Sequence, residues 1–520
     1  MKRIIYILLI AGSLLGSSCT DWLTVYPTNE QVTDDYWKSE EDVEAVLSSG
    51  YYYMRKSVGD FIDWGELRGS SIYKRSTNDM QMFQMLSSSK GCDWSTIYKV
   101  INMANSVLKY APGVLAEDDA YSEAAMNSNL CEAYFMRALM YFYLVRNFKE
   151  VPLILEPYVD DSQPMQKAKS SEKEIVDQIK KDIETALGTG AAKEFYDGSD
   201  PRAWKNKGRG TVWALYALMS DVCLWSEDWD GCINYADKIL NANATFRPVF
   251  LAESVKDNPD TWFSIFNPGN SQESIFELQF SNSLSQTSGS PSGIFTGAGS
   301  SYWYSLPMLE RLVAEAKECG GTGRAYFGAC IFDTDNDGLT DYTGATEAYI
   351  WKYLGGENSS GDVANLRTTK DANFIIYRVT DIILMKAEAL IWKGGADSFA
   401  QALELINKIR VRAGLPESTL SPSETDELTM LETLLNERDI EFAAEGKRWY
   451  DLMRFGRSKD YKYKQQFIQL LSENNQLVRA AWISSVLSDN DSWFLPISDS
   501  EIKNNPLLEQ NPYYGGTSKK

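Results

Sequence analysis

The stretch NLCEAYFMRALMYFYLVRNF, residues 129–148, decides the fold class of this chain. Apolar side chains recur in it every three or four residues, the spacing of one helix face, and they are Leu130, Tyr134, Ala138, Tyr141, Val145 and Phe148. Pro152 follows closely and predicts that the helix ends before it. The stretch therefore predicts a long amphipathic helix.

Further helical patterns surround it and come in pairs. A second helix is predicted at about 172–188, and the same theme returns at 208–226 with 228–241 and at 378–394 with 398–414. Each pair joins two helices through a short turn and carries alanines where helices approach closely. These hairpins look like tetratricopeptide units, which cannot bury their apolar face alone and so stack. The pattern predicts a mainly α fold in which long insertions interrupt the stack.

The sequence pattern changes between about 245 and 372. SIFELQF, residues 274–280, has the character of a strand, and the Ser- and Gly-rich segment 281–305 that follows predicts a loop. This loop carries four aromatic residues: Phe295, Tyr302, Trp303 and Tyr304. A disordered linker rarely holds so many rings, so we favour a binding loop over a linker.

The N-terminus has the features of an export signal. Lys2 and Arg3 precede an apolar run at 4–15 that is too short to span ~30 Å of hydrocarbon. The sequence LGSSC then resembles a bacterial lipobox, in which cleavage after Ser18 leaves a lipid-modified Cys19. Acyl chains would hold the mature protein on a membrane surface. The alternative is an ordinary signal peptide that leaves Cys19 unmodified.

Composition excludes several function classes. The formal charge of −21 argues against nucleic-acid binding, which needs clustered Lys and Arg. The chain has no histidine, which removes His-dependent triads and His-bearing zinc sites. A carboxylate-pair glycosidase or lyase remains open, although 72 acidic residues do not single out a pair. Cys131 and Cys223 are expected to be small buried side chains, and Cys319 and Cys330, which flank a Gly-rich turn, are the pair most suited to a disulfide.

Seven segments now point to one family. They are LCEAYFMRALMYFYLVRNFKEVPL, GRGTVWALYALMSDVCLW, SIFELQF, YRVTDIILMKAEAL, INKIRVRAGL, NERDIEFAAEGKRWYDLMRFGR and WFLPISDSEIKNNPLLEQNPYY. In this order, behind a lipobox, they resemble the SusD/RagB family of outer-membrane lipoproteins. The resemblance implies four tetratricopeptide-like helix pairs packed against an irregular ligand-binding region. It also implies a non-enzymatic, outward-facing nutrient-binding protein that caps a SusC-like TonB-dependent transporter.

The expected organisation and function follow from this resemblance. We divide the chain into a signal peptide (1–18), a lipid anchor and tether (19–40), a helical region (41–245), a loop-rich ligand-binding region (246–372) and C-terminal helices integrated with the rest (373–520). The leading hypothesis is capture of oligosaccharides for a SusC-like transporter. Peptide capture is the alternative among binding proteins, and a purely structural helical scaffold is a further one.

The charged residues of the C-terminal segment favour a scaffold role. Acids, bases and an indole alternate at helical spacing there, which suits a buried ion-pair network; they are Glu437, Arg438, Glu445, Arg448, Trp449, Asp451 and Arg454, with Arg378 and Asp381 in a similar pattern. A direct ligand role for these residues is the less favoured alternative.

Two loops combine aromatic rings with polar groups, as a sugar site requires. The first, 73–94, supplies Asn78, Asp79 and Trp94. The second is the Ser/Gly-rich loop with Phe295, Tyr302, Trp303 and Tyr304. The alternative for Trp94 is a core position, because it opens a helical pattern.

One acidic stretch resembles a calcium loop. DTDNDGLTDY sets Asp333, Asp335, Asp337 and Asp341 at the D-x-D-x-D-G spacing. Position twelve is Gly344 instead of the usual Glu, so Glu347 would have to substitute. A structural calcium ion is therefore a hypothesis with a solvated acidic turn as its alternative, and no other cofactor is expected.

Overall fold

The computed structural model describes residues 36–159, 166–296, 300–320, 323–331, 348–354, 367 and 369–515, with the side chains of 326, 327, 330 and 331 left aside. Its longer helices are α3 (Glu40–Lys56), α4 (Val58–Glu66), α5 (Ser95–Val114), α6 (Glu123–Phe148), α7 (Glu172–Gly188), α9 (Val212–Trp225), α10 (Trp229–Leu240), α13 (Leu306–Glu318), α15 (Val379–Lys393), α16 (Ala396–Arg412), α17 (Glu427–Glu441), α18 (Arg448–Tyr461), α19 (Lys464–Asn474) and α20 (Ala480–Leu487). Its shorter helical pieces are η2 (Lys90–Cys92), α8 (Trp204–Gly208), α11 (Asp260–Phe266), α12 (Pro291–Ile294), α14 (Arg324–Gly328), η4 (Asn490–Trp493), α21 (Asp499–Asn504) and α22 (Pro512–Gly515).

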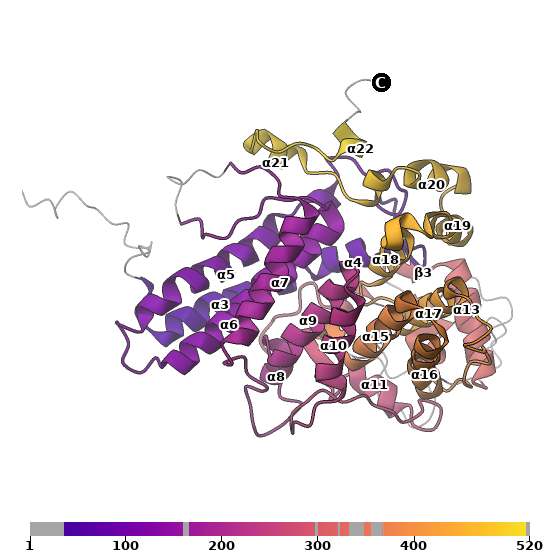
Figure 1. The fold of residues 1–520 in the computed structure, drawn as a ribbon, viewed down its shortest axis with the longest axis horizontal. Helices are drawn as coiled ribbons and strands as arrows, with labels where there is room; N and C mark the ends of the chain where they lie inside the picture. The colour runs from indigo at the N-terminus through magenta and orange to yellow at the C-terminus, as the bar shows by residue number, and fades with distance from the viewer. Residues whose placement is uncertain are drawn as a thin grey trace, which may run out of the picture.

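The helices stack as antiparallel pairs (Figure 1). α3 packs on α5, α6 on α7, α9 on α10 and α15 on α16, while α5–α6, α7–α9 and α10–α15 contacts join one pair to the next. The three hairpins predicted from periodicity are confirmed, and so is the mainly helical fold. In the pair formed by α3 and α5, the two helices are not consecutive in sequence. Helix α4 and the loop that lines the candidate site come between them.

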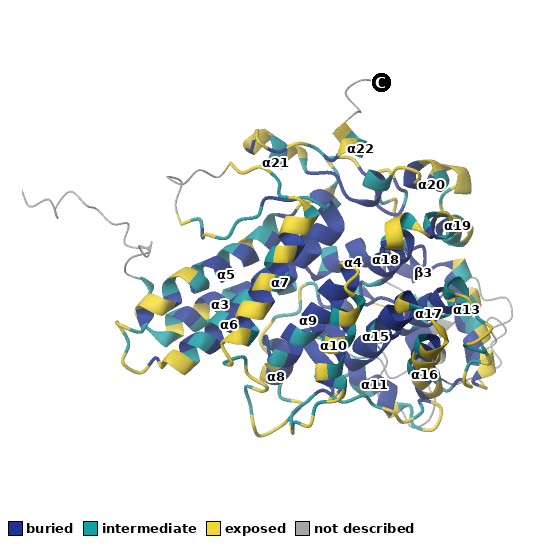
Figure 2. Ribbon diagram, viewed as in Figure 1, coloured by how far each residue is buried: buried dark blue, intermediate teal, exposed yellow. Residues whose placement is uncertain are grey.

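Helix α6 is more deeply enclosed than an amphipathic helix. Every side chain from Phe135 to Phe148 is buried, because α3 and α5 cover one side of the helix and α7 and α9 the other. Its buried cations have partners: Arg137 makes a two-pronged ion pair with Asp182 of α7, at 2.7 and 2.8 Å. Figure 2 shows α15 buried in the same way, whereas α7 and α16 keep an exposed strip. The predicted helix is confirmed. The expectation of a single buried apolar face is wrong, because from Phe135 to Phe148 side chains are buried all around the helix.

Two small antiparallel sheets lie beside the helices. β2 (Ser274–Leu278) pairs with β6 (Phe374–Arg378), which confirms the strand expected in SIFELQF. The other sheet has the order β1–β3–β5–β4, with β1 (Ile72–Lys74), β3 (Tyr302–Tyr304), β5 (Ala348–Ile350) and β4 (Ala329–Ile331).

Strand β3 corrects one expectation. Residues 302–304 were expected in a loop, yet they pair in register with Lys74, Tyr73 and Ile72 of β1. Three residues are too few for their alternation to be visible in the sequence, and only pairing with β1 and β5 makes them a strand.

Cys131 and Cys223 are buried as expected. The Cys319 Sγ lies 3.7 Å from the Ala413 carbonyl oxygen, and the side chain of Cys330 lies outside the described part, so the disulfide stays a prediction. Within the described ranges, no helix combines the length and the apolar character needed to cross a membrane.

Candidate functional site

A cavity of ≈ 360 Å³ opens beside strand β1. Its wall comes from the start of α4, from Lys74 of β1, from the loop 77–91 and from Tyr302 of β3. Three of the residues predicted for ligand binding line it together: Asn78, Asp79 and Tyr302. The two loops singled out in the sequence, more than 200 residues apart, therefore meet at one cavity.

The loop 77–91 is held in place by one buried amide. The Gln81 side chain accepts a hydrogen bond from the backbone N–H of Lys74 (2.7 Å) and donates to the carbonyls of Lys74 (3.0 Å) and Ser76 (3.1 Å). The Asn78 Oδ1 accepts from the backbone N–H of Met80 (2.9 Å), which closes a local turn. Its Nδ2 makes no hydrogen bond with a described residue, so an amide donor remains available at the cavity wall.

Tyr302 contributes an aromatic ring whose position is fixed, because its hydroxyl is hydrogen-bonded within the protein. Its hydroxyl donates to Asp63 of α4 (2.5 Å), and the Lys74 Nζ lies 2.6 Å from the same carboxylate and 4.7 Å from the ring centroid. Burial, followed by the charge of Asp63, raises the pKa of Tyr302 far above its ordinary value, so the phenol keeps its proton. This cluster forms a rigid, nearly neutral side of the cavity.

Asp60 stands apart from that cluster. It is half-buried on the cavity wall, and its carboxylate makes no hydrogen bond or ion pair with any residue in the described ranges. Burial, then the neighbouring charge of Asp63, raises the pKa of Asp60 to about 6. An acceptor without a partner is costly in such a place, and it offers two oxygens to a ligand that brings hydrogen-bond donors.

The remaining predicted rings are packed within the protein. Trp94 packs edge-on against Phe148 (5.0 Å between centroids), and Phe295 stacks on Tyr353 (5.7 Å). The Tyr304 hydroxyl donates to the Gly328 carbonyl (3.0 Å). All three are buried.

Trp303 projects to the opposite side of β3 from Tyr302. It is 1 % exposed, with the Arg75 guanidinium 4.6 Å from its ring centroid and Tyr349 of β5 against its edge at 4.3 Å. A ligand-binding role for Trp94, Phe295, Trp303 and Tyr304 stays a prediction. In this structure their rings are occupied by packing.

A second cavity, of ≈ 600 Å³, lies between α5, the segment 152–158 and α21, and Trp94 lines it. Its buried amides are already used: Asn102 exchanges two hydrogen bonds with the backbone of Tyr158 (3.1 and 2.7 Å), Asn105 donates to the carbonyls of Ile154 and Glu156, and Asn505 donates to the carbonyl of Lys167. The exposed Asn504 also lines it. The cavity beside β1 holds the Asp60 carboxylate and three of the predicted ligand-binding residues, which makes it the better candidate for a polar ligand.

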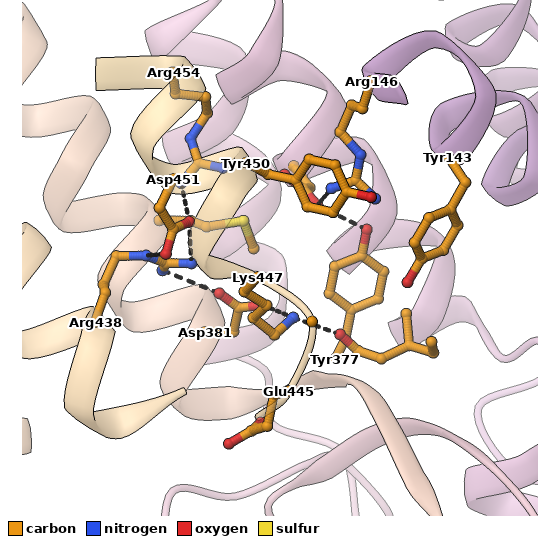
Figure 3. Close-up of a pocket in the computed structure, with 14 residues that line it drawn as sticks. Tyr143, Arg146, Tyr377, Asp381, Arg438, Glu445, Lys447, Tyr450, Asp451 and Arg454 are labelled. Atoms are coloured by element: carbon orange, nitrogen blue, oxygen red, sulfur yellow. Dashed lines mark hydrogen bonds and ion pairs between the residues drawn. The ribbon is translucent and has the colours of Figure 1, made fainter. Parts of the chain in front are cut away.

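The C-terminal motif forms a buried ion-pair network, as predicted (Figure 3). Asp451 pairs with Arg438 (2.9 Å) and Arg454 (2.7 Å), and Asp381 pairs with Arg438 (3.0 Å) and Lys447 (2.7 Å). Although burial alone would raise it, these two cations lower the pKa of Asp381 to about 2. The space among these side chains is only ≈ 20 Å³, enough for about one water molecule.

The rest of the motif is bonded in the same way. Glu437 pairs with Arg324 (2.5 Å), Glu445 with Arg378 (2.9 Å) and Arg448 with Asp439 (3.3 Å). The Trp449 ring faces the Arg68 guanidinium at 4.2 Å. The motif is a scaffold in this structure, which confirms the favoured interpretation.

Two predicted sites lie outside the described residues. These are the lipidation site Cys19 and the calcium loop with Asp333, Asp335, Asp337 and Asp341. Within the described part of the chain, no group of acidic or cysteine side chains is placed to hold a metal ion. Both sites stay predictions, and the loss of thermal stability on chelation would test the second.

Sequence reasoning missed Asp60, Asp63, Lys74 and Lys90 of the cavity wall. One signal was present. Three acids at a spacing of three residues, Asp60, Asp63 and Glu66, interrupt the stretch VGDFIDWGE of α4, and such acids on a helix that is packed against the protein need a reason.

Two family models match this chain in separate parts. Residues 21–224 match a model described as starch-binding and associating with the outer membrane, and residues 333–514 match the SusD family model. A relative, SusD-like protein P38 of Formosa agariphila, is 26% identical over 98% of both chains. The chain belongs to the SusD/RagB family.

Other SusD proteins extend the comparison. A SusD-like protein of Bacteroides ovatus is 24% identical over 96% of both chains, and the starch-binding protein SusD of Bacteroides thetaiotaomicron is 27% identical over 34% of this chain and 28% of its own. A SusD superfamily structure from Bacteroides thetaiotaomicron superposes with a TM-score of 0.70 at 20% identity, covering 92% of this chain and 99% of its own. A structure described as a laminarin-binding SusD-like protein gives 0.67 at 21%, covering 91% and 99%. These likenesses show the SusD fold, and proteins of this family bind ligands without catalysing a reaction.

Proposed function

We propose that this SusD-family chain captures oligosaccharides in the cavity beside β1 and passes them to a SusC-like TonB-dependent transporter of the outer membrane. The observation that carries the proposal is Asp60, a half-buried carboxylate on a cavity wall with no partner among the described residues. Sugar hydroxyls are donors that would complete its hydrogen bonds.

The other wall groups suit the same ligand. The Asn78 Nδ2, which makes no hydrogen bond with a described residue, can donate to a hydroxyl oxygen, and the exposed Lys90 adds a second donor at the rim. Tyr302 supplies an aromatic edge, but Lys74 lies over its ring, so the cavity recognises sugars through hydrogen bonds more than through stacking. A cavity of ≈ 360 Å³ accepts a short piece of a glycan.

The relatives support this class of ligand. One is named a starch-binding protein, one solved structure is described as laminarin-binding, and the N-terminal family model is described as starch-binding and associating with the outer membrane. Lipidation at Cys19, with the body facing the exterior, would keep the cavity beside a transporter.

Calorimetry and affinity electrophoresis against a panel of polysaccharides, starch and laminarin included, test the proposal. The wild-type protein should bind at least one glycan, Asp60→Asn and Asn78→Ala should weaken that binding, and the exposed Asp119→Asn should not. A peptide library run in parallel tests the alternative. Binding of peptides and of no glycan would replace this function with peptide capture.

A further inference from the structure

Trp482 presents an uncovered indole beside the candidate site. Among the described tryptophans, only Trp204 and Trp482 are more than a third exposed, at 56% and 43%. Trp482 lies near the start of α20, and its neighbours Ala480 and Ala481 are exposed and small. No described aromatic ring or cation covers its faces, unlike Trp229, which stacks on Trp392.

The orientation of this indole is fixed by the loop that lines the cavity. The Trp482 Nε1–H donates to the carbonyl of Met82 at 3.3 Å. Met82 is two residues from Met80 and three from Met85, and both of those line the cavity. Two residues span at most about 7 Å of backbone. The indole is therefore attached to the cavity rim at a short distance, with its polar N–H satisfied by the protein and its ring left to the outside.

The surroundings of Trp482 have the composition of a binding surface. Leu86, at the far end of the same loop, is 59% exposed, and Leu477 is 37% exposed. The segment that leads into α20 is attached to the β1–β3 sheet: Asn475 donates to the Ser70 hydroxyl (3.2 Å), and Gln476 accepts from the backbone N–H of Leu306 (2.6 Å). Exposed apolar side chains on anchored elements next to a polar cavity are a mark of ligand contact.

Arg479 adds hydrogen-bond donors at the N-terminal end of α20. It is the N-cap residue of α20, and its carbonyl accepts a hydrogen bond from the backbone N–H of Trp482 (2.9 Å). It is exposed, and its guanidinium makes no hydrogen bond or ion pair with a described residue. An indole face next to a guanidinium suits a sugar residue, whose C–H face packs on the ring while its hydroxyls meet the cation.

We propose that Trp482 is the stacking platform of a second subsite, which binds the sugar units of an oligosaccharide that extend beyond the cavity beside β1. This inference rests on the proposed function, because it needs a glycan in that cavity. It predicts that the contribution of Trp482 depends on the length of the glycan: short oligosaccharides occupy the cavity alone, and longer ones also cover the indole.

The test uses the full-length protein and the polysaccharide of the panel that wild type binds, cut into a size series from disaccharide upward. Trp482→Ala should weaken binding of the long oligosaccharides by roughly 5- to 150-fold, by analogy with bases stacked on aromatic side chains. Binding of the disaccharide should change less than about twofold. Trp204→Ala, which removes the other exposed indole, should leave the whole series unchanged.

Trp482→Phe separates stacking from support of the loop, because it keeps a ring and removes the N–H bonded to Met82. Stacking predicts that it retains most of the affinity for long oligosaccharides, and the melting temperature of each variant shows that it is folded. Three results would overturn the inference. The Phe and Ala variants could lose the same affinity, Trp482→Ala could weaken short and long oligosaccharides equally, or it could leave the affinity unchanged. Failure of the wild-type protein to bind any glycan would instead overturn the proposed function, and this inference with it.

Discussion

At the residue scale, Asp60 is the clearest conflict between stability and function. The charged groups around it are Asp63 on its own helix and Lys74, Lys90 and Asp93 from β1 and the following loop. Burial and Asp63 raise the pKa of Asp60 to about 6, so keeping this carboxylate ionised at neutral pH lowers the free energy of unfolding. A cost of this kind, placed on the wall of a cavity, indicates a binding role.

Asp60→Asn should therefore stabilise the protein and weaken ligand binding. Folded Asp60 holds its proton up to about pH 6, whereas an unfolded Asp releases it near pH ~3.9. The folded state binds more protons in this window, so the free energy of unfolding falls as pH rises through it. The melting temperature of Asp60→Asn should exceed that of wild type at pH 7.5, and the difference should shrink at pH 4.5. A difference that is constant with pH would contradict the assignment.

The same residue predicts a pH dependence of binding. At pH 7 Asp60 is mostly ionised and accepts from sugar hydroxyls, and a charge-assisted hydrogen bond of this kind is worth about 1.5–3 kcal/mol. At pH 5 the carboxyl is mostly protonated. Calorimetry should show that wild-type affinity for its glycan falls between pH 7 and pH 5, while the weaker binding of Asp60→Asn stays level.

At the element scale, the three residues of strand β3 project to both faces of the sheet. Tyr302 and Tyr304 project to one side, where Tyr302 reaches the cavity and Tyr304 the core, and Trp303 projects to the other side between Arg75 and Tyr349. This alternation follows from the two-residue period of a strand. One short strand thus places a side chain at the candidate site and packs the other two side chains on opposite faces of the sheet.

Trp303→Ala tests whether this ring is packing or platform. Because Trp303 is buried against two partners, its loss should lower the free energy of unfolding by roughly 3–5 kcal/mol, the usual cost of a large-to-small change. Urea unfolding measures this directly. A variant that keeps its stability but loses glycan affinity would instead place Trp303 in the binding site.

At the scale of the whole molecule, a buried charge network joins parts of the chain that are far apart. Arg378, at the end of β6, pairs with Glu273 before β2 (3.0 Å), with Glu441 of α17 (2.7 Å) and with Glu445 (2.9 Å). All of these side chains are fully buried. The network fixes the small β2–β6 sheet against the C-terminal helices.

Arg378→Met should destabilise the fold strongly. Removing Arg378 takes one cation from three buried carboxylates, which keep only Arg412, Arg324 and Lys352 as partners. Weakening a buried charge network in this way costs about 3–5 kcal/mol. Chemical denaturation would measure it, with the exposed Arg202→Met as the matched control. A loss as small as that of the control would show that the remaining arginines compensate.

The location of the whole molecule depends on a single predicted modification. If Cys19 carries the lipid, Cys19→Ser should move the protein from the membrane fraction to the soluble fraction without changing its melting temperature. Fractionation followed by immunoblotting checks this. Retention of the variant in the membrane fraction would contradict lipid anchoring.

The sequence alone determined the helices and the family. Helical periodicity over long segments such as 129–148 is a local property, because the residues of one face lie three or four positions apart. Some of the alternating charges between Glu437 and Arg454 pair with each other, as Asp451 does with Arg438 and Arg454, so part of the buried network could be predicted. Other partners come from distant segments: Arg324 for Glu437 and Glu388 for Arg454.

The candidate site was decided by the tertiary structure. Asp60, Asn78 and Tyr302 come from a helix, a loop and a strand, and only the pairing of β1 with β3 brings them to one cavity. The sequence identified Trp94 and Trp303 as rings for a ligand, but burial depends on what packs over a side chain. For these two rings, distant segments supply that cover: Phe148 for Trp94, and Arg75 with Tyr349 for Trp303.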